Sequence, residues 1–356
     1  MDKKRLLVYG LILALLAVLV YFQFRTWRDF DWATFWAESR SVRLDHILLA
    51  IGLIYITYVM RALRWKIFLR PVRRDLPVSR LVAPTLIGFT GQALLGRPGE
   101  LIRPYLIARR ADLSFTSQMA AWAVERIFDI GAFAVLLVLA IFLPSDLRFL
   151  PNPEIYPRLR VAGFMLIGLV AGLALAAVVV AMSGEALAAW IERRFSHLAA
   201  NLSHRIAARV REFHSGLDTI HSFASLVQIS AVSLLMWWFI ALAYREVTHS
   251  YGPALQHMTL SKVFLLMGSS MLGSLVQLPG VGGGSQLATI SALQHIFLAP
   301  HELAASCGLL LWLVTFVSVV PAGLVLAHFE RISLRKLSKE TSQAEETTEA
   351  SPAASS

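Results

Sequence analysis

The sequence predicts an all-α, polytopic membrane protein, and three observations carry that prediction. The chain has 356 residues, of which 56% are hydrophobic and only 16% are charged. Soluble domains carry roughly 25% charged residues because their surfaces face water. The mean hydropathy is +0.62, and the apolar residues gather in runs of about the length that a membrane-spanning helix requires. Lipid must therefore cover most of the chain.

The long apolar runs are the candidate transmembrane helices, and they predict about seven or eight spans. They are Leu6–Phe22, Leu44–Met60, Ala120–Leu143, Val161–Met182, Phe223–Tyr244, Val263–Leu278 and Leu303–Phe329. The first could be mistaken for a secretory signal peptide. We interpret it as a retained helix, since Tyr21-Phe22-Gln23-Phe24 is a poor cleavage site and typical of an interfacial aromatic belt.

Two further apolar stretches, Leu81–Leu95 and Leu287–Leu298, are short and lie beside runs of glycine and proline. Segments of this length favour re-entrant or half-spanning helices. Matched Gly/Pro-broken segments in the two halves of a transporter point to its binding site. We therefore expect two re-entrant segments and a possible inverted repeat, although the residues themselves show no repeat.

The charge distribution predicts the orientation. Lys and Arg outnumber Asp and Glu by 33 to 23, and membrane proteins collect positive charge in cytoplasmic loops. The loop from Arg61 to Arg80 contains seven basic residues and one acid, so we expect it in the cytoplasm, whereas the loop Arg25–Asp45 is balanced and should lie outside. Basic residues also follow the last run. We expect an inner (cytoplasmic) membrane protein with both termini in the cytoplasm, and no nucleic acid partner.

Two further segments outside the predicted spans have a distinct composition. Residues 185–214 are charged but have helical hydrophobic periodicity, which predicts a cytoplasmic amphipathic helix lying on the membrane or packed on protein. Residues 331–356 become polar and low in complexity, which predicts a disordered cytoplasmic tail. The chain thus divides into a membrane domain over 1–330 and a tail over 331–356.

Cofactor signatures are absent from the sequence. Cys307 is the sole cysteine, so neither an intrachain disulfide nor a cysteine-based zinc site can form. No HExxH or Walker A motif is present, and the glycines after Pro279 have no βαβ context. We expect no metal, no cofactor and no soluble nucleotide.

The first candidate site is Arg97-Pro98-Gly99-Glu100 together with Arg103. Proline and glycine predict a turn that opens a helix. A helix N-terminus attracts anions, and two arginines beside it would clamp a phosphate by bidentate hydrogen bonds. The alternative is a cytoplasmic loop with a surface ion pair.

The second candidate site is Glu125-Arg126-Ile127-Phe128-Asp129, which adjoins a long apolar run. Glu125 and Asp129 are spaced i,i+4 and face the same way on a helix. Ionisable residues inside a membrane segment line a polar cavity or pair with one another. The alternative is a salt bridge to Arg97 or Arg103 that only fixes helix packing.

The third candidate site is the glycine-rich loop that follows Pro279, with Gly280, Gly282, Gly283, Gly284 and then Gln286. Glycines let the backbone approach a ligand closely and present its N–H groups to an anion. A flexible hinge between half-helices is the other interpretation, and the two are compatible.

These three stretches, with Arg61-Ala62-Leu63-Arg64-Trp65, resemble the flippase-like transmembrane family, which includes the membrane domain of lysylphosphatidylglycerol synthases. The four motifs occur in the family's order across about residues 55–325. Two positions depart from the family pattern, since Gln286 stands where the family has glutamate and Val281 where it has glycine. The two-domain synthases also carry a soluble aminoacyltransferase-like domain that has no counterpart in this sequence.

The resemblance implies binding of an anionic phospholipid or polyprenyl-phosphate-type lipid and its movement between leaflets. Arg97, Arg103 and the glycines would hold the lipid phosphate. Charge balance or head-group contacts would come from Glu100, Glu125, Arg126, Asp129 and Gln286. Two alternatives stay open: a membrane-embedded enzyme with Glu100, Glu125 and Asp129 as acid or base, and a scaffold that transports nothing.

Overall fold

The computed structural model describes residues 30–144, 146–150, 154–172, 175, 183, 186, 188–190, 192–193, 223–274 and 283–330. Four expectations lie wholly or largely outside this part of the chain. They are the first span Leu6–Phe22, the amphipathic helix over 185–214, the tail over 331–356, and the loop positions Gly280 and Gly282.

The first described helix, α2 (Trp32–Arg40), lies in a segment that we expected to be a loop. Its cause is local: the Asp31 side chain accepts hydrogen bonds from the backbone N–H groups of Ala33 (2.9 Å) and Thr34 (3.2 Å). Such an N-cap satisfies donors that a helix start otherwise leaves unpaired. Trp32 and Trp36 are more than half exposed on this short helix.

Helix α3 (Leu44–Leu69) extends nine residues beyond the predicted end of its apolar run at Met60. The expectation that Arg61 and Arg64 belong to a cytoplasmic loop is therefore wrong. Apolar residues continue between and after these arginines, and Trp65 and Phe68 are buried. The helix persists because that apolar face packs inside the protein while the arginines find partners there.

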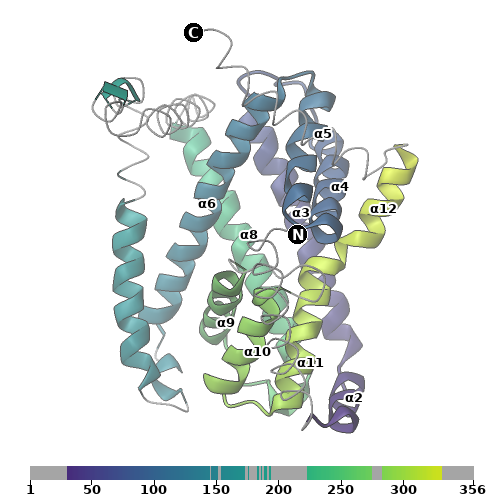
Figure 1. Ribbon diagram of the computed structural model, residues 1–356, viewed down its shortest axis with the longest axis vertical. Helices are drawn as coiled ribbons and strands as arrows, with labels where there is room; N and C mark the ends of the chain where they lie inside the picture. The colour runs from purple at the N-terminus through teal and green to yellow at the C-terminus, as the bar shows by residue number, and fades with distance from the viewer. Residues whose placement is uncertain are drawn as a thin grey trace, which may run out of the picture.

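Helix α4 (Ser79–Leu95) confirms the predicted short helix, and it is followed by the 3-10 turn η1 (Arg97–Leu101) and by α5 (Ile102–Ala111). Gly96, at the turn, has φ +70°, a conformation that favours glycine. In Figure 1 α4 and α5 lie side by side in the upper half of the molecule, and the two helices are in contact.

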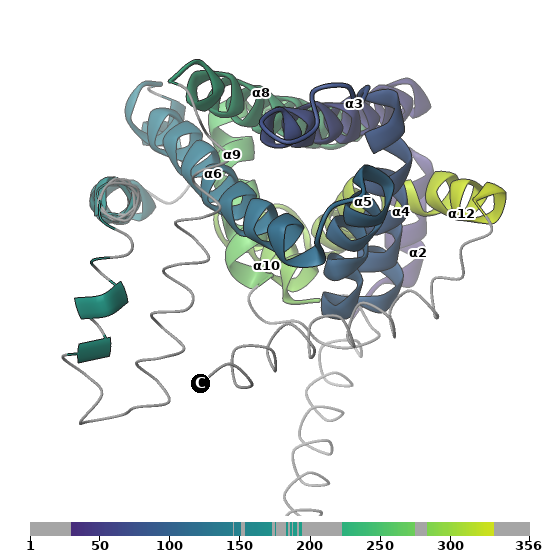
Figure 2. The same cartoon turned by 90° about the horizontal axis from the view of Figure 1, so that it is seen from above.

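The long helices that follow are α6 (Phe115–Phe142), a helix over Ile155–Gly172, and α8 (Phe223–His249). The short turns η2 (Asp146–Phe149) and η3 (Gly252–Ala254) lie in the connections. Seen from above, α3 and α8 run together along one side of the bundle and α6 lies across from α3 (Figure 2).

Helices α9 (Leu260–Gly273) and α10 (Gly284–His295) form a second short pair, in the lower half of Figure 1. The predicted full span over Val263–Leu278 is wrong in its extent, because α9 has only 14 residues. At 1.5 Å per residue it covers about 21 Å, less than the roughly 30 Å of a hydrocarbon core. The two helices meet closely where Gly273 lies against the Gly284 carbonyl and Ala288.

The last span is one helix of three parts: α11 (His301–Trp312), the π-helical turn η4 (Leu313–Val317) and α12 (Val319–Phe329). The Ser318 N–H donates to the Leu313 carbonyl (2.8 Å), which is the i→i−5 bond of a π-turn. α12 leans away from the line of α11 in Figure 1 and packs on α4, where Gly323 lies against Thr90.

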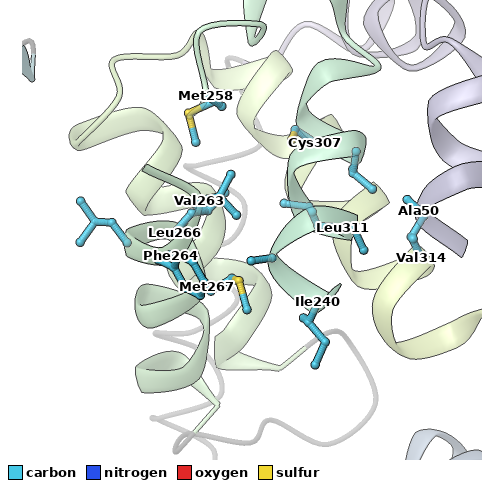
Figure 3. Close-up of a cluster of buried hydrophobic side chains, with 14 of the residues drawn as sticks. Ala50, Ile240, Met258, Val263, Phe264, Leu266, Met267, Cys307, Leu311 and Val314 are labelled. Carbon is cyan, nitrogen blue, oxygen red and sulfur yellow. The ribbon is translucent and has the colours of Figure 1, made fainter. Parts of the chain in front are cut away.

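The main hydrophobic core lies among α3, α8, α9 and α11, and Figure 3 shows part of it around Met258, Phe264 and Leu311. Among the described residues, four helices are long and apolar enough to cross a bilayer. Helix α6 has 28 residues but carries Glu125, Arg126 and Asp129 in its middle. Large apolar side chains such as Leu48 and Leu139 remain exposed on the outside. The chain is a multi-pass membrane protein.

The glycine contact between α12 and α4 predicts that two glycine-to-alanine substitutions change the thermal stability in opposite directions. A Cβ at Gly323 would overlap the Thr90 side chain, whereas one at Gly52 in α3 would meet nothing within 4 Å. Alanine stabilises a helix by roughly 1 kcal/mol relative to glycine, but overpacking destabilises by about 1–3 kcal/mol. In detergent, thermal unfolding should show a lower Tm for Gly323→Ala and an equal or higher Tm for Gly52→Ala. Equal Tm values for the two variants would contradict this helix contact.

Candidate functional site: a buried arginine–carboxylate cluster

The centre of the site is the pair of carboxylates on α6. Glu125 and Asp129 are one helical turn apart, as the sequence predicts, and both are buried. They face the bundle interior toward α3 and α5, which supply the three arginines of the cluster. We define the arginine cluster as Arg61, Arg64, Arg103, Glu125 and Asp129.

Arg64 of α3 joins both carboxylates. Its Nη1 donates to Asp129 Oδ1 (2.6 Å) and to the Ser233 hydroxyl of α8 (2.7 Å). Its Nη2 donates to Glu125 Oε1 and to Asp129 Oδ2 (3.2 Å for the latter). The side chain is 0% exposed. Arg64 thus ties α3, α6 and α8 together through charge-assisted hydrogen bonds.

Arg103 of α5 makes a bidentate pair with Glu125. Its Nη1 donates to Oε1 at 3.1 Å and its Nη2 donates to Oε2. The guanidinium carbon also lies 4.5 Å from the Trp65 ring centroid and 5.1 Å from that of Phe89. Trp65 is held in turn by donating its Nε1–H to the Gln118 side chain at 3.0 Å.

Gly88 of α4 lets Arg103 reach this position. A Cβ at Gly88 would stand inside contact distance of the Arg103 Cα and Cβ atoms. The two helices of the α4–α5 hairpin therefore approach closely at the residue that carries the guanidinium. Similarly close approaches occur between Gly91 and Ile102 and between Gly99 and the Gly91 carbonyl.

Arg61 of α3 is the most loosely held arginine of the cluster. Its Nη1 is 3.8 Å from Asp129 Oδ2, and its guanidinium carbon lies 4.7 Å from the Phe89 ring centroid. The side chain is 12% exposed. With three arginines and two carboxylates, the arginine cluster carries a formal net charge of +1 inside the membrane domain.

A small pocket adjoins the arginine cluster. Its lining residues come from α4, η1, α5 and α6: Gly88, Phe89, Gln92, Glu100, Arg103 and Arg126. The half-buried Glu100 accepts hydrogen bonds from Gln92 (3.3 Å) and Arg126 (3.4 Å). The pocket has room for about one water molecule. A larger group must widen it to reach Arg103.

The structure brings together four of the sequence-predicted site residues, Glu100, Arg103, Arg126 and Glu125, and places Asp129 beside them. The ion pair that the alternative interpretation of the second candidate site expects, with Arg97 or Arg103, is present between Glu125 and Arg103. Arg97 begins η1, and its side chain lies outside the described part of the structure.

The residues of the glycine-rich loop are only partly described. Gly283 is the N-cap of α10, without a side-chain cap, and Gly284 is the first helical residue. Gln286 is buried and accepts a hydrogen bond from the Ser285 hydroxyl (3.3 Å). Among the described residues, no hydrogen bond or ion pair joins these three positions to the arginine cluster.

Sequence reasoning missed Arg61 and Arg64 as site residues, because it assigned them to a loop. The available signal was their i,i+3 spacing inside a stretch whose other residues through Phe68 are apolar except Lys66. Nothing in the sequence marks Ser233 as a site residue, because a serine within an apolar helix is common. Within the described part of the chain, no group of three or more His, Cys, Asp or Glu side chains is arranged to hold a metal ion.

The fold and the buried charges define a multi-pass membrane protein with an ionic site inside its helical bundle. The chain belongs to the lysylphosphatidylglycerol synthase TM region family, whose sequence profile matches residues 7–323. This confirms the resemblance drawn from the motifs. The UPF0104 membrane protein of Methanothermobacter thermautotrophicus is 25% identical over 272 residues, which cover 73% of this chain and 78% of that protein. No solved structure matches the chain.

The geometry predicts that Glu125 is needed for folding. Glu125→Gln leaves Arg64 and Arg103 without their shared negative partner, and breaking a buried pair costs about 3–5 kcal/mol. We expect a large fall in Tm in detergent, or loss of folded protein. The matched control is Glu154→Gln, because Glu154 forms an exposed ion pair with Arg158 (3.1 Å) and such pairs contribute at most about 1 kcal/mol. If Glu125→Gln and Glu154→Gln unfold at the parent temperature, the charge network does not hold the helices together.

Proposed function

We propose that this protein binds the phosphate of an anionic phospholipid or polyprenyl-phosphate-type lipid and moves the lipid between leaflets. The observation that supports it best is the excess of one cation in a buried cluster of a lipid-covered bundle. A buried ion requires a partner of opposite charge. A lipid phosphate supplies that charge while its acyl chains stay in the hydrocarbon layer.

The pocket beside Arg103 is the proposed point where the head group enters. Arg103 is engaged by Glu125 and the pocket is small, so a phosphate would exchange with part of this ion pair. Arg64 would keep Glu125 neutralised during the exchange, because it also donates to Oε1. Glu100 and Arg126 line the mouth and would contact the rest of the head group.

The two short helix pairs support an alternating-access mechanism. The α4–α5 pair occupies one end of the bundle and the α9–α10 pair the other (Figure 1). We propose that both are re-entrant, related as inverted halves, and that each opens the polar interior to one leaflet. The start of α10 would add backbone N–H donors for the phosphate, since Gly283 provides no side-chain cap.

The orientation that we propose places the α4–α5 end in the cytoplasm of the inner membrane, with both termini on that side. Exposed basic side chains gather there, at or just past the end of α3, at the start of α4 and in the last turn of α5: Arg70, Arg74, Arg80 and Arg109. The opposite end carries α2 with its exposed tryptophans, which suit an outer interface.

We propose transport without chemical change to the lipid. Arg64 and Arg103 occupy the oxygens of Glu125 and Asp129, so neither carboxylate is free to act as a general base. Incubation of the purified protein with lipid extracts should leave their mass spectra unchanged. New lipid species would favour the enzyme alternative.

Arg103 provides the direct test of the proposed function. Arg103→Ala removes the excess positive charge and the pocket guanidinium, while Glu125 keeps Arg64 as its partner. In liposomes with a fluorescent phosphatidylglycerol and a leaflet-selective quencher, we expect translocation to fall to the rate of empty liposomes, with normal membrane insertion. Arg158→Ala, in an exposed ion pair, is the control and should transport normally.

Parent-like transport by Arg103→Ala would remove the phosphate site from the mechanism. If the parent protein itself transports no lipid and a cluster-neutralised variant still supports normal lipid distribution in cells, the scaffold alternative is favoured.

A further inference from the structure

Arg61 is the arginine of the cluster that is held only by a long ion pair, to Asp129. No hydrogen bond from its guanidinium is found to any described residue, its Nε is buried without a partner, and its nearest carboxylate oxygen is 3.8 Å away. A guanidinium has five N–H donors, and leaving buried donors unmade is unfavourable. Arg61 therefore has unused capacity to bind an anion.

The carboxylates of the cluster cannot fill this capacity. Glu125 accepts from Arg64 and Arg103 through both of its oxygens, and Asp129 accepts from Arg64 through both of its own. The α3 dipole does not stabilise the Arg61 charge either. Its favourable effect on cations is confined to the last turn, whereas Arg61 lies eight residues before Leu69.

Phe89 stands between the pocket and Arg61. Its ring contacts the guanidinium groups of both Arg61 (4.7 Å) and Arg103 (5.1 Å). Phe89 and Arg103 line the pocket and Arg61 does not. A head group in the pocket thus meets Arg103 first, and it reaches Arg61 only when the Phe89 ring moves.

Beyond Arg61, the same face of α3 continues with Tyr58 and Tyr55 at intervals of three residues. Tyr58 packs on Phe89 with ring centroids 5.1 Å apart, and Tyr55 packs on Tyr58. The Tyr55 hydroxyl donates to the Ser318 carbonyl (2.8 Å), next to the π-helical turn. This face connects the arginine cluster with the bend in the last span.

We infer that Arg61 forms a second phosphate-binding site, separate from the Arg103 pocket and covered by Phe89, on the path along the Tyr55–Tyr58–Arg61 face of α3. The inference rests on the proposed function, since the ligand is the phosphate of the same lipid. Two sites that share one phosphate in turn would let it leave Arg103 without entering hydrocarbon unpaired.

The test is equilibrium binding to the full-length protein in a neutral detergent, with dihexanoyl phosphatidylglycerol as the probe. Arg61→Gln should weaken binding by ~10-fold or more, the effect of one charge-assisted hydrogen-bonded contact. Arg61→Lys should fall between Arg61→Gln and the parent, since lysine keeps the charge without the planar fork. Arg158→Gln is the matched surface control and should bind as the parent does.

Thermal unfolding separates binding from structural support. Arg61 makes no hydrogen bond to the described protein, so Arg61→Gln should unfold at or above the parent Tm. Arg64→Gln should unfold far below it. A fall in Tm for Arg61→Gln as large as that for Arg64→Gln overturns the inference, as does parent-like affinity in Arg61→Gln.

Two further binding measurements identify the ligand. Dihexanoylglycerol, which lacks the phosphate, should bind weakly and equally to the parent and Arg61→Gln; binding as tight as that of the phospholipid would refute phosphate recognition. Inorganic phosphate should compete poorly, and competition at the lipid's own affinity would make the ligand a free anion. If the parent protein transports no lipid but Arg61→Gln loses lipid binding, the proposed transport function is refuted and the second phosphate site is supported. Transport by the parent with unchanged binding in Arg61→Gln refutes the site alone.

Discussion

The structure depends on the burial of ionic hydrogen bonds in a medium where water cannot replace them. In the bundle interior, the attraction between Arg64 and the two α6 carboxylates is strong, and so is the penalty for leaving any of these charges alone. Arg64 is 0% exposed and joins three helices. The arrangement fixes α3, α6 and α8 relative to one another. The arginine cluster has one positive charge more than its two carboxylates neutralise. That remaining charge is the physical reason to look for an anion.

Close helix contacts make this arrangement possible. Glycines at the α4–α5 interface bring Arg103 beside Glu125, and Gly323 brings α12 against α4. Lipid offers little hydrophobic drive for helix association, so small residues and polar contacts carry much of the packing in membranes. The helices of the pairs α4–α5 and α9–α10 are each shorter than the roughly 20 residues of a full span. The π-helical turn η4 contacts both α4 and α12. Residues of α4 also line the pocket beside the arginine cluster.

The sequence predicted the membrane class, most helix positions and the short helix α4, because hydrophobic length and glycine placement are local signals. It also predicted that Glu125 and Asp129 share a face, and it left a salt bridge from this site to Arg97 or Arg103 open as an alternative. The sequence analysis did not assign the roles of Arg61 and Arg64, although their i,i+3 spacing was a signal. A run of arginines is typical of a cytoplasmic loop, and only the partners on α6 and α8, distant in sequence, make a helix interior favourable for them. The end of α9 at Gly273 was also missed, because the apolar residues continue past it to Leu278.

The central claim is that the arginine cluster holds a lipid phosphate, and a structure of the protein in nanodiscs of phosphatidylglycerol tests it most directly. The account predicts phosphate density within about 3 Å of the Arg103 or Arg61 guanidinium, continuous with acyl-chain density on the outside of the bundle. An arginine cluster that keeps every ion pair unchanged in those nanodiscs, with phosphate density confined to the protein surface, would contradict the account.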